Sequence, residues 1–181
     1  MSPQPCEDAY CRRELASLQL LQQHPHENVL WLQEAAYDSC LHLSESQKLY
    51  SRLVLVLENC MMNTATFQAS LGDALPEAWA RPFCSQMFLA LTHLASLRIL
   101  HNDLKPENLL LSGGQGAGLT LKIGDFGCSA ILPDGHEYVV GGRCITTWAY
   151  ASPEVFQLHA CRYSFASDVW SAGDSALYLN L

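Results

Sequence analysis

The sequence is poor in positive charge. Of its 181 residues, ten are Lys or Arg and 18 are Asp or Glu, which gives a formal net charge of −8. Proteins that bind nucleic acids or anionic membranes use clustered Lys and Arg to meet phosphate groups. We therefore expect neither a nucleic acid nor a membrane as the main partner, although an acidic balance often reflects solubility alone.

Long apolar runs and export signals are also missing. No apolar stretch approaches the roughly 20 residues that a membrane-spanning helix needs. The opening MSPQPCEDAY has neither the basic region nor the apolar core of a signal peptide. The eight cysteines form no C-x-x-C pair. Because disulfide frameworks are typical of short secreted chains, we expect reduced and mostly inert thiols in a cytoplasmic or nuclear protein.

What is present is a globular composition with 49% hydrophobic and 15% charged residues. The length suits one domain with a hydrophobic core. Apolar residues at spacings of three and four predict helices over 9–23 and 77–97, with Pro82 near the start of the second. Residues 59–76 look irregular or weakly helical. Ser167 and Asp168 are placed to cap a later helix that contains Val169 and Trp170.

Denser apolar runs predict four strands, over 28–36, 51–58, 108–111 and 119–123. The run at 51–58 contains β-branched valines and reads as a buried strand. The polar residues 38–50 suit a hairpin-like connection. The glycine-rich 112–118, SGGQGAG, has two interpretations: a phosphate-binding loop or a turn between strands. It lacks the lysine and the following helix of a phosphate loop, which favours the turn.

Two short motifs carry the chemistry. DLKPEN places Asp103, Lys105 and Asn108 in one tight loop, and GDFG places Asp125 at the end of a predicted strand. Carboxylate and amide oxygens are the hard ligands that Mg²⁺ takes together with phosphate oxygens. Acids, an amide and a lysine in this pattern are the components of phosphoryl transfer.

The motifs HNDLKPENLL, KIGDFG, TTWAYASPE and SDVWSAG stand in this order between residues 101 and 173. In sequence and order they resemble the eukaryotic protein kinase family. The resemblance extends over about 10–173 and implies an α+β, two-lobe fold in partial form. It would contain the αC helix and last strands of the N-lobe, then the helical C-lobe as far as αF. We expect one partial kinase domain over 1–181, divided into an N-lobe remnant at about 9–58 and a partial C-lobe at 59–181.

The resemblance also implies roles for individual residues. Asp103 would be the catalytic base, and Lys105 would neutralise charge on the transferred phosphoryl group. Asn108 and Asp125 would hold Mg²⁺, and Thr147 would contact the catalytic aspartate and lysine. Lys-Pro-Glu-Asn in this loop is the serine/threonine pattern, so the implied reaction transfers the γ-phosphoryl group of ATP to a Ser or Thr of a protein.

For the nucleotide, Leu57 resembles the gatekeeper, Glu58 and Cys60 would offer backbone groups to adenine, and Leu110 would lie beneath the base. Ordinary core packing remains open for each of these. Glu14 fits the αC glutamate that pairs with a lysine of the third strand.

Four further residues would support this site. The resemblance implies that His101 and Phe126 pack in an apolar spine with Leu18. It also implies that Asp168 anchors the catalytic-loop backbone, which is compatible with a helix cap.

Two expected kinase elements are not found in the sequence. There is no G-x-G-x-x-G, and none of the three lysines, at 48, 105 and 122, can be the third-strand lysine. These absences predict that the polypeptide as written binds ATP poorly, phosphorylates slowly or not at all, and aggregates. A catalytically inactive kinase-like interaction module and a truncated gene-model fragment are the alternatives. The polar break at Asp174–Ser175 suggests that 174–181 is a non-native tail.

Asn102 stands where most family members have arginine. Because a short neutral amide cannot pair with a phosphate, we expect independence from phosphorylation of the segment 125–154. The sequence assigns neither the substrate, the kinase subfamily nor the oligomeric state.

Overall fold

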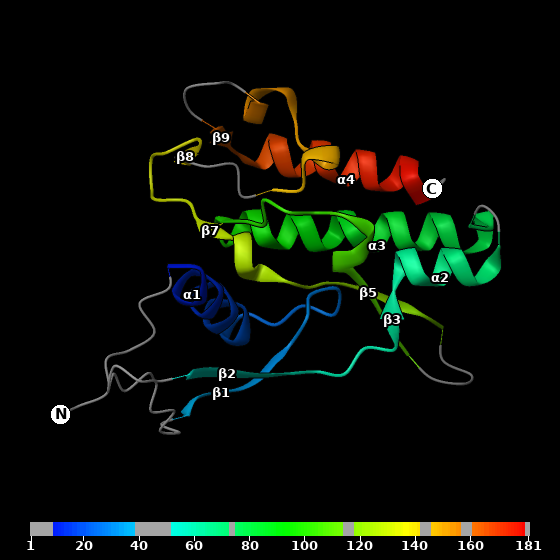
Figure 1. The fold of residues 1–181 in the computed structure, drawn as a ribbon, viewed down its shortest axis with the longest axis horizontal. Helices are drawn as coiled ribbons and strands as arrows, with labels where there is room; N and C mark the ends of the chain where they lie inside the picture. Colours follow the sequence, from blue (N-terminus) through cyan, green and yellow to red (C-terminus); the bar gives the residue numbers. More distant parts are fainter. Residues whose placement is uncertain are drawn as a thin grey trace, which may run out of the picture.

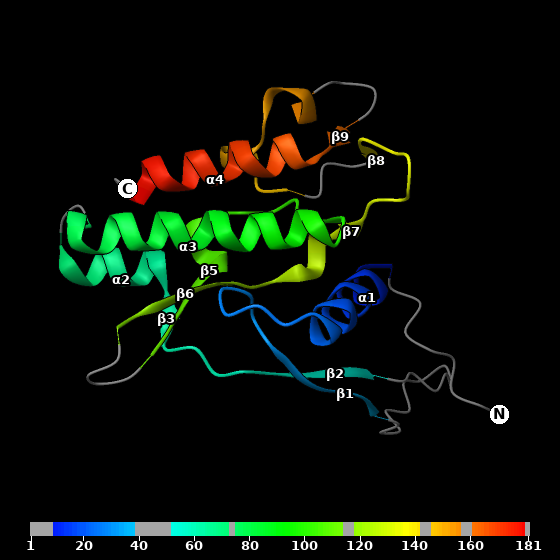
Figure 2. The ribbon, with the colours of Figure 1, turned by 180° about the vertical axis from the view of Figure 1, so that it is seen from behind.

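The computed structural model describes residues 9–38, 52–72, 75–113, 118–141, 146–156 and 161–179. Within these ranges the fold is mixed α+β, as predicted. The helices are α1 (Ala9–Gln23), α2 (Thr64–Leu71), α3 (Glu77–Ser96) and α4 (Phe165–Leu179). Figure 1 shows α3 and α4 side by side, with α2 at one end of α3 and α1 next to the pair β1–β2. The opposite view in Figure 2 shows the same arrangement.

The strands form small antiparallel sheets. β1 (Leu32–Asp38) pairs with β2 (Arg52–Leu57), and β3 (Met62–Asn63), β5 (Leu109–Ser112) and β6 (Thr120–Ile123) form a three-stranded sheet. Two further pairs join β4 (Ile99–Leu100) to β7 (Ala130–Ile131) and β8 (Val139–Gly141) to β9 (Cys161–Tyr163). Short 3₁₀ turns complete the chain: η1 (Pro106–Asn108), η2 (Phe126–Cys128), η3 (Trp148–Tyr150) and η4 (Pro153–Phe156).

The predicted helix 9–23 is confirmed as α1, whose Leu18 and Leu21 are buried in the main core. The strand predicted over 28–36 begins only at Leu32. The residues before Leu32 lie beside β6 instead, because Val29 forms a parallel bridge with Ile123 of that strand. The connection from α1 to β1 is thereby fastened to the three-stranded sheet.

The prediction of a buried strand over 51–58 is wrong in one respect. β2 forms and pairs with β1, but Val54 and Val56 are 39% and 42% exposed. The alternate side chains Leu55 and Leu57 pack against the core. Among the described strands β2 pairs with β1 alone, and α1 lies on one side of this pair (Figure 1), so the side chains of the opposite face remain in solvent.

For residues 59–76 we expected irregular or weakly helical structure, and α2 forms within this segment. The Asn63 side chain accepts a hydrogen bond from the Thr66 amide at 2.8 Å, and Gly72 ends the helix at φ 74°. Asparagine before the helix and glycine after it are ordinary helix-end signals, and these were overlooked in the sequence. Phe67 of α2 packs edge-on against Trp79 and Phe83 of α3, which fixes the two helices together.

α3 confirms the predicted helix at 77–97 and carries the largest buried face. Phe83, Met87, Leu91 and Leu94 recur at three- and four-residue spacing and are at most 8% exposed. Pro82 lies in the second turn, inside the helix, where it removes one helical N–H donor. α3 packs on β6 and on α4. The strand pairing supports a turn at 112–118, of which 114–117 lie outside the described residues.

α4 begins before the predicted cap. Ser164 and Ser167 exchange hydrogen bonds at the helix start, so Asp168 lies within the first turn and is free to bind another element. The helix runs through Leu179, and Ser175 and Leu179 are buried. That residues 174–181 are a non-native tail stays a prediction.

Among the described residues, Cys60, Cys84 and Cys161 form no disulfide bond. Among the helices that the structure describes, none is long and apolar enough to cross a membrane.

Candidate active site

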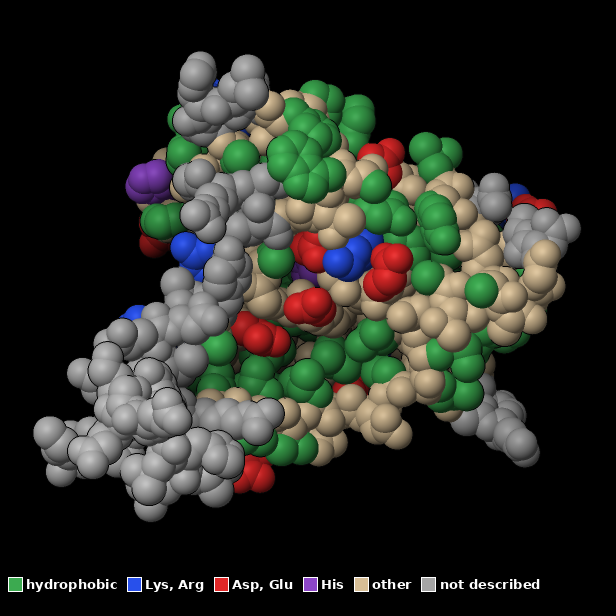
Figure 3. Space-filling model, in the orientation of Figure 1, with side chains coloured by type: hydrophobic (Ala, Val, Ile, Leu, Met, Phe, Trp, Pro, Cys, Tyr) green, Lys and Arg blue, Asp and Glu red, His purple; other side chains and the backbone are tan. Residues whose placement is uncertain are grey.

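The two motifs meet beside the main core. The loop 101–108, here called the catalytic loop, runs from β4 through η1 into β5, and Asp125 follows β6, the antiparallel neighbour of β5. Figure 3 shows acidic and basic side chains gathered at the centre of one face, next to a strip of hydrophobic side chains. Apolar elements next to this loop thus hold it in place.

Asp103 is held by three neighbours. Its Oδ1 accepts the backbone N–H of Thr147 at 2.7 Å, and its Oδ2 lies 2.9 Å from Lys105 Nζ. Asn108 Nδ2 donates to the Asp103 carbonyl at 2.8 Å. The carboxylate is therefore fixed relative to both the catalytic loop and the segment that contains Thr147.

Lys105 joins the same network. Its Nζ donates to Thr147 Oγ1 at 2.9 Å while it contacts Asp103. The predicted contact of the threonine with both charged residues is therefore present. The two residues come from distant parts of the sequence, and the catalytic loop and residues 146–150 are bound together at this point.

The charges of the pair stabilise one another. Burial alone would raise the pKa of Asp103, but hydrogen bonds from Lys105 and Thr147 outweigh it and lower that pKa below its ordinary value. Burial opposes the charge of Lys105 as well, yet the bond to Asp103 raises its pKa. Both groups are therefore charged at neutral pH.

Asp125 and Asn108 offer oxygen atoms next to this pair. Asp125 has a left-handed backbone, with φ 60°, and its side chain accepts the Gly127 N–H at 3.3 Å. Asn108 uses its NH₂ group on the Asp103 carbonyl, which leaves its amide oxygen as an acceptor. Among the described residues no three His, Cys, Asp or Glu side chains form a metal cluster. A bound Mg²⁺ would thus need phosphate oxygens besides these two groups.

Asp168 fixes the backbone of the catalytic loop. Its two carboxylate oxygens accept the N–H groups of His101 and Asn102, each at 2.8 Å. Asp168 is 3% exposed, and burial raises its pKa although the two N–H bonds act in the opposite direction. The anchoring contact that the resemblance implied is therefore present.

His101 connects the catalytic loop to the strand before Asp125. Its Nε2 binds the Gly124 carbonyl at 2.9 Å, and its Nδ1 accepts the Asp103 N–H at 3.2 Å. The ring packs edge-on against Phe126, with centroids 5.2 Å apart. Phe126 shares the main core cluster with Leu18 of α1, so the predicted packing group is assembled.

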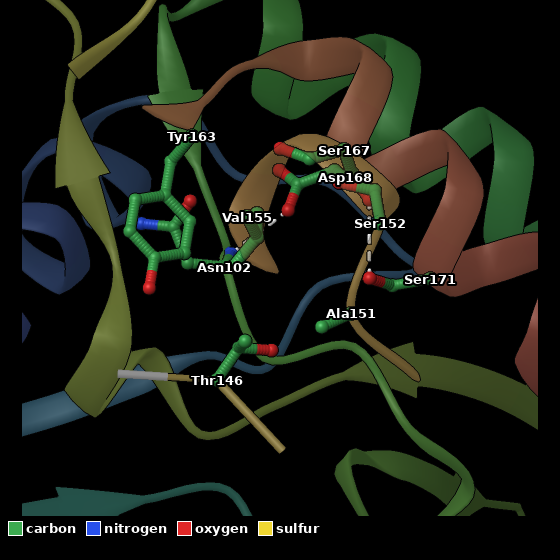
Figure 4. Close-up of a pocket in the computed structure, with 9 residues that line it drawn as sticks. All are labelled: Asn102, Thr146, Ala151, Ser152, Val155, Tyr163, Ser167, Asp168 and Ser171. Atoms are coloured by element: carbon green, nitrogen blue, oxygen red, sulfur yellow. Dashed lines mark hydrogen bonds between the residues drawn. The ribbon is translucent and has the colours of Figure 1, made fainter. Parts of the chain in front are cut away.

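Asn102 has φ 67° and donates from Nδ2 to the Cys128 carbonyl at 2.9 Å. Asparagine tolerates this left-handed conformation better than most residues. Its Oδ1 faces a pocket too narrow for a water molecule (Figure 4). Within the described ranges, neither this oxygen nor Ser152 Oγ has a hydrogen-bond partner. The pocket lies between the catalytic loop, residues 146–155, β9 and α4. It is lined by Asn102, Thr146, Ala151, Ser152, Val155, Tyr163, Ser167, Asp168 and Ser171.

The residues expected to contact adenine lie along the segment after β2. Glu58 Oε1 accepts the Trp31 N–H at 2.7 Å and pairs with Lys122 at 3.0 Å. Leu57 and Cys60 are half-buried, and so is Leu110 on β5. A Cβ added to Gly124 would lie 2.7 Å from Leu110 Cδ1, so the strand before Asp125 approaches this leucine closely. Burial raises the pKa of the Cys60 thiol.

Glu14 is half-buried on α1, and burial followed by the charge of Asp125 raises its pKa. The two described lysines are engaged elsewhere, Lys105 with Asp103 and Lys122 with Glu58. Lys48 lies outside the described residues. The structure therefore brings Glu14 near Asp125 but shows no lysine beside it within the described ranges.

Sequence reasoning missed two contacts of the segment after Asp125. Ser129 Oγ bonds Ser17 Oγ at 2.7 Å and joins this segment to α1. Arg98 donates to the carbonyls of Leu132, Pro133 and His136. No motif marks these residues, and only the fold brings them together.

A family model described as "Protein kinase domain" matches residues 3–179. The chain belongs to the protein kinase family. It is 32% identical over 160 residues to the human serine/threonine-protein kinase STK11, covering 86% of this chain and 33% of the relative. It is 29% identical over 161 residues to the cyclin-dependent kinase 4 homolog of Caenorhabditis elegans, covering 89% and 36%. The chain spans about a third of the length of these kinases.

Proposed function

We propose that this kinase-family chain transfers the γ-phosphoryl group of ATP to a Ser or Thr hydroxyl of a protein. The observation that carries the proposal is the arrangement of Asp103, whose carboxylate is bound by Lys105 and the Thr147 amide. A carboxylate held in this way can accept or orient the proton of an incoming hydroxyl group. The Ser/Thr preference rests on the Lys-Pro-Glu-Asn sequence and on the names of the relatives.

In this proposal each charged group has one task. Asp103 positions the hydroxyl and accepts its proton, and Lys105 offsets negative charge on the transferred group. Asn108 and Asp125 would hold Mg²⁺, which supplies charge neutralisation at the phosphates. Thr147 positions the other two, because it contacts Asp103 through its amide and Lys105 through its hydroxyl.

We assign the nucleotide to the space between Asp125 and the segment after β2. Leu57 would border the base as gatekeeper, Glu58 and Cys60 would offer backbone groups to it, and Leu110 would lie beneath it. The half-burial of these side chains supports the assignment, because a ligand could cover what remains exposed. Glu14 would lie at the phosphate side, near Asp125.

The same assignment divides the domain. Residues 9–58, with α1 and β1–β2, correspond to N-lobe elements, α1 being the αC helix. Residues 59–181 correspond to the C-lobe, with α3 and α4 as αE and αF. The contacts of α1 with η2 support this division, since they place the αC helix against the Asp125 segment.

A non-catalytic interaction module is the second candidate. One observation favours it, namely that neither described lysine lies beside Glu14. Because a missing preorganised charge commonly costs two to three orders of magnitude in rate, we expect slow transfer. Slow transfer that depends on Asp103 distinguishes a weak kinase from a binding module.

The nucleotide and metal assignments are tested by thermal unfolding with ATP, with and without Mg²⁺. We expect Mg²⁺ and ATP together to raise the melting temperature, and Asp125→Asn to remove the rise. Glu154→Gln, outside the proposed metal site, should keep it. If Mg²⁺ and ATP together leave the melting temperature of the unaltered chain unchanged, the proposal is contradicted and the interaction module is supported.

A further inference from the structure

Two histidine rings join the connection between α1 and β1 to helix α3. His26 of the connection stacks on His93 of α3 with centroids 4.8 Å apart and planes inclined by 23°. His93 Nε2 lies 2.8 Å from the His24 carbonyl, an acceptor, so this nitrogen carries a hydrogen. The pair thus fastens α1 and its connection to α3.

The stack requires a neutral His26. Its Nδ1 lies 3.1 Å from the Asn28 amide nitrogen and accepts that N–H, so Nδ1 has no hydrogen of its own. Protonation at Nδ1 would break this hydrogen bond. It would also place a positive charge against the ring of His93.

Most of the groups around His26 also favour its neutral form. Burial lowers the pKa of His26, and His93 from α3 and Lys122 from β6 lower it further. Glu27, on the same connection, raises it, and Lys122 is itself paired with Glu58. The folded state depresses the pKa of His26. Neutral His26 therefore contributes fully to the free energy of unfolding above the pKa of the unfolded chain, about 6.5, and this contribution is lost as the pH falls through the pKa of the folded chain.

The connection also holds the strand that leads to Asp125. Asn28 Nδ2 donates to the Leu121 carbonyl at 2.9 Å and to Gln86 of α3 at 3.2 Å. The Asn28 carbonyl accepts the Ile123 N–H at 2.9 Å. Ile123 is two residues before Asp125, so loss of the His26–Asn28 bond acts on a residue that supports the end of β6.

We propose that the His26–His93 stack is a pH-sensitive contact that fastens the connection 24–31 to α3 and loosens when His26 is protonated in mildly acidic solution. The contact would respond within a range that cells reach, because histidine titrates there. It involves none of the residues assigned to catalysis or to nucleotide binding, and it does not depend on the proposed function.

The test is an NMR titration of the histidine rings from pH 7.5 to 5.0, without nucleotide. We expect His26 to titrate below about 6.5. Hydrogen exchange, corrected for its intrinsic pH dependence, should show the amides of Asn28 and Ile123 losing protection by about three- to tenfold with the same midpoint. His26→Phe keeps an aromatic ring and should abolish this pH response.

His136→Phe is the matched control, because His136 is exposed in the segment after β7; it should keep the full pH response. His93→Phe removes the neighbouring imidazole and should raise the midpoint of His26. A His26 midpoint at or above about 6.5 overturns the proposal. So does a protection loss in His26→Phe equal to that of the unaltered chain. Should His26→Phe fail to fold, the titrations of the unaltered chain and of His93→Phe decide.

Discussion

Two buried oxygen atoms beside the catalytic loop have no hydrogen-bond partner in the part of the chain that the structure describes, although most buried polar groups in proteins are hydrogen-bonded. They belong to Asn102 and Ser152, and Figure 4 shows both at the same pocket. An unpaired buried hydroxyl costs about 1–3 kcal/mol. The Ser152 hydroxyl is therefore an unfavourable group at a position where a smaller side chain would fit.

Ser152→Ala should therefore raise the free energy of unfolding by about 1 kcal/mol, since it removes a hydroxyl that has lost water and gained no bond. Ser171→Ala is the matched control. Ser171 Oγ donates to the Tyr150 carbonyl at 2.7 Å, and its loss should lower stability by about 1 kcal/mol. Urea unfolding of the three proteins measures both changes. Equal destabilisation by the two substitutions would show that Ser152 has a partner.

Cys128 illustrates how the site makes a thiol inert. Burial, followed by the charges of Asp103 and Asp125, raises its pKa to about 11. The thiolate is the reactive form, so alkylation by iodoacetamide at pH 8 should be about 100-fold slower than that of free cysteine. Mass spectrometry of the tryptic peptide follows the rate. Labelling at the rate of free cysteine would contradict this account of the charges around Asp103.

Among the elements, α4 acts as the support of the catalytic loop. Its Asp168 is the buried carboxylate that binds two consecutive amides of that loop. Asp168→Ala leaves both N–H groups buried without an acceptor, and we expect a loss of about 2–4 kcal/mol. Asp168→Asn keeps one acceptor oxygen, so its free energy of unfolding should lie between those of Asp168→Ala and the unaltered chain.

Urea unfolding measures these losses, and hydrogen exchange at His101 and Asn102 locates them. If Asp168→Ala unfolds at the same urea concentration as the unaltered chain, the loop does not depend on α4.

Hydrogen bonds from neighbouring side chains hold the segment after Asp125 in place. Asn102 donates to the Cys128 carbonyl, Ser129 bonds Ser17, and Arg98 binds three carbonyls. Phosphatase treatment should thus leave transfer activity within about twofold. If activity disappears after this treatment and a phosphate is mapped to Tyr138 or Thr146, the segment does depend on phosphorylation and the prediction is wrong. Asn102→Arg is the informative variant, since it supplies a guanidinium group that could bind a phosphate on this segment.

Across the whole molecule, helices and strands with a regular apolar pattern could be predicted from the sequence, whereas individual side-chain contacts and exposures could not. α1 and α3 follow from apolar spacing, and the pair β5–β6 from two apolar runs around glycines. The exposure of Val54 and Val56 could not be read from composition, because it depends on which strands lie beside β2. The start of α4 was misplaced because Asp168 resembles a cap, whereas the fold directs it to another loop.

The candidate site divides in the same way. The motifs predicted that Asp103, Lys105 and Thr147 would meet, although the last lies more than 40 residues away. They gave no sign of the stack between His26 and His93 or of the bond between Ser17 and Ser129. Those contacts join residues outside any motif, and only the packing of α1 and α3 around the core brings them into reach.

The central claim is phosphoryl transfer that depends on Asp103. The most direct measurement is the transfer of labelled γ-phosphate from Mg²⁺·ATP to a generic protein substrate, followed by phosphoamino-acid analysis. We predict slow labelling of serine or threonine that falls at least about 100-fold in Asp103→Asn. Glu107→Gln, an exposed neighbour in the same loop, should retain it. Labelling no greater than that of Asp103→Asn, or labelling that survives this substitution, would contradict the account.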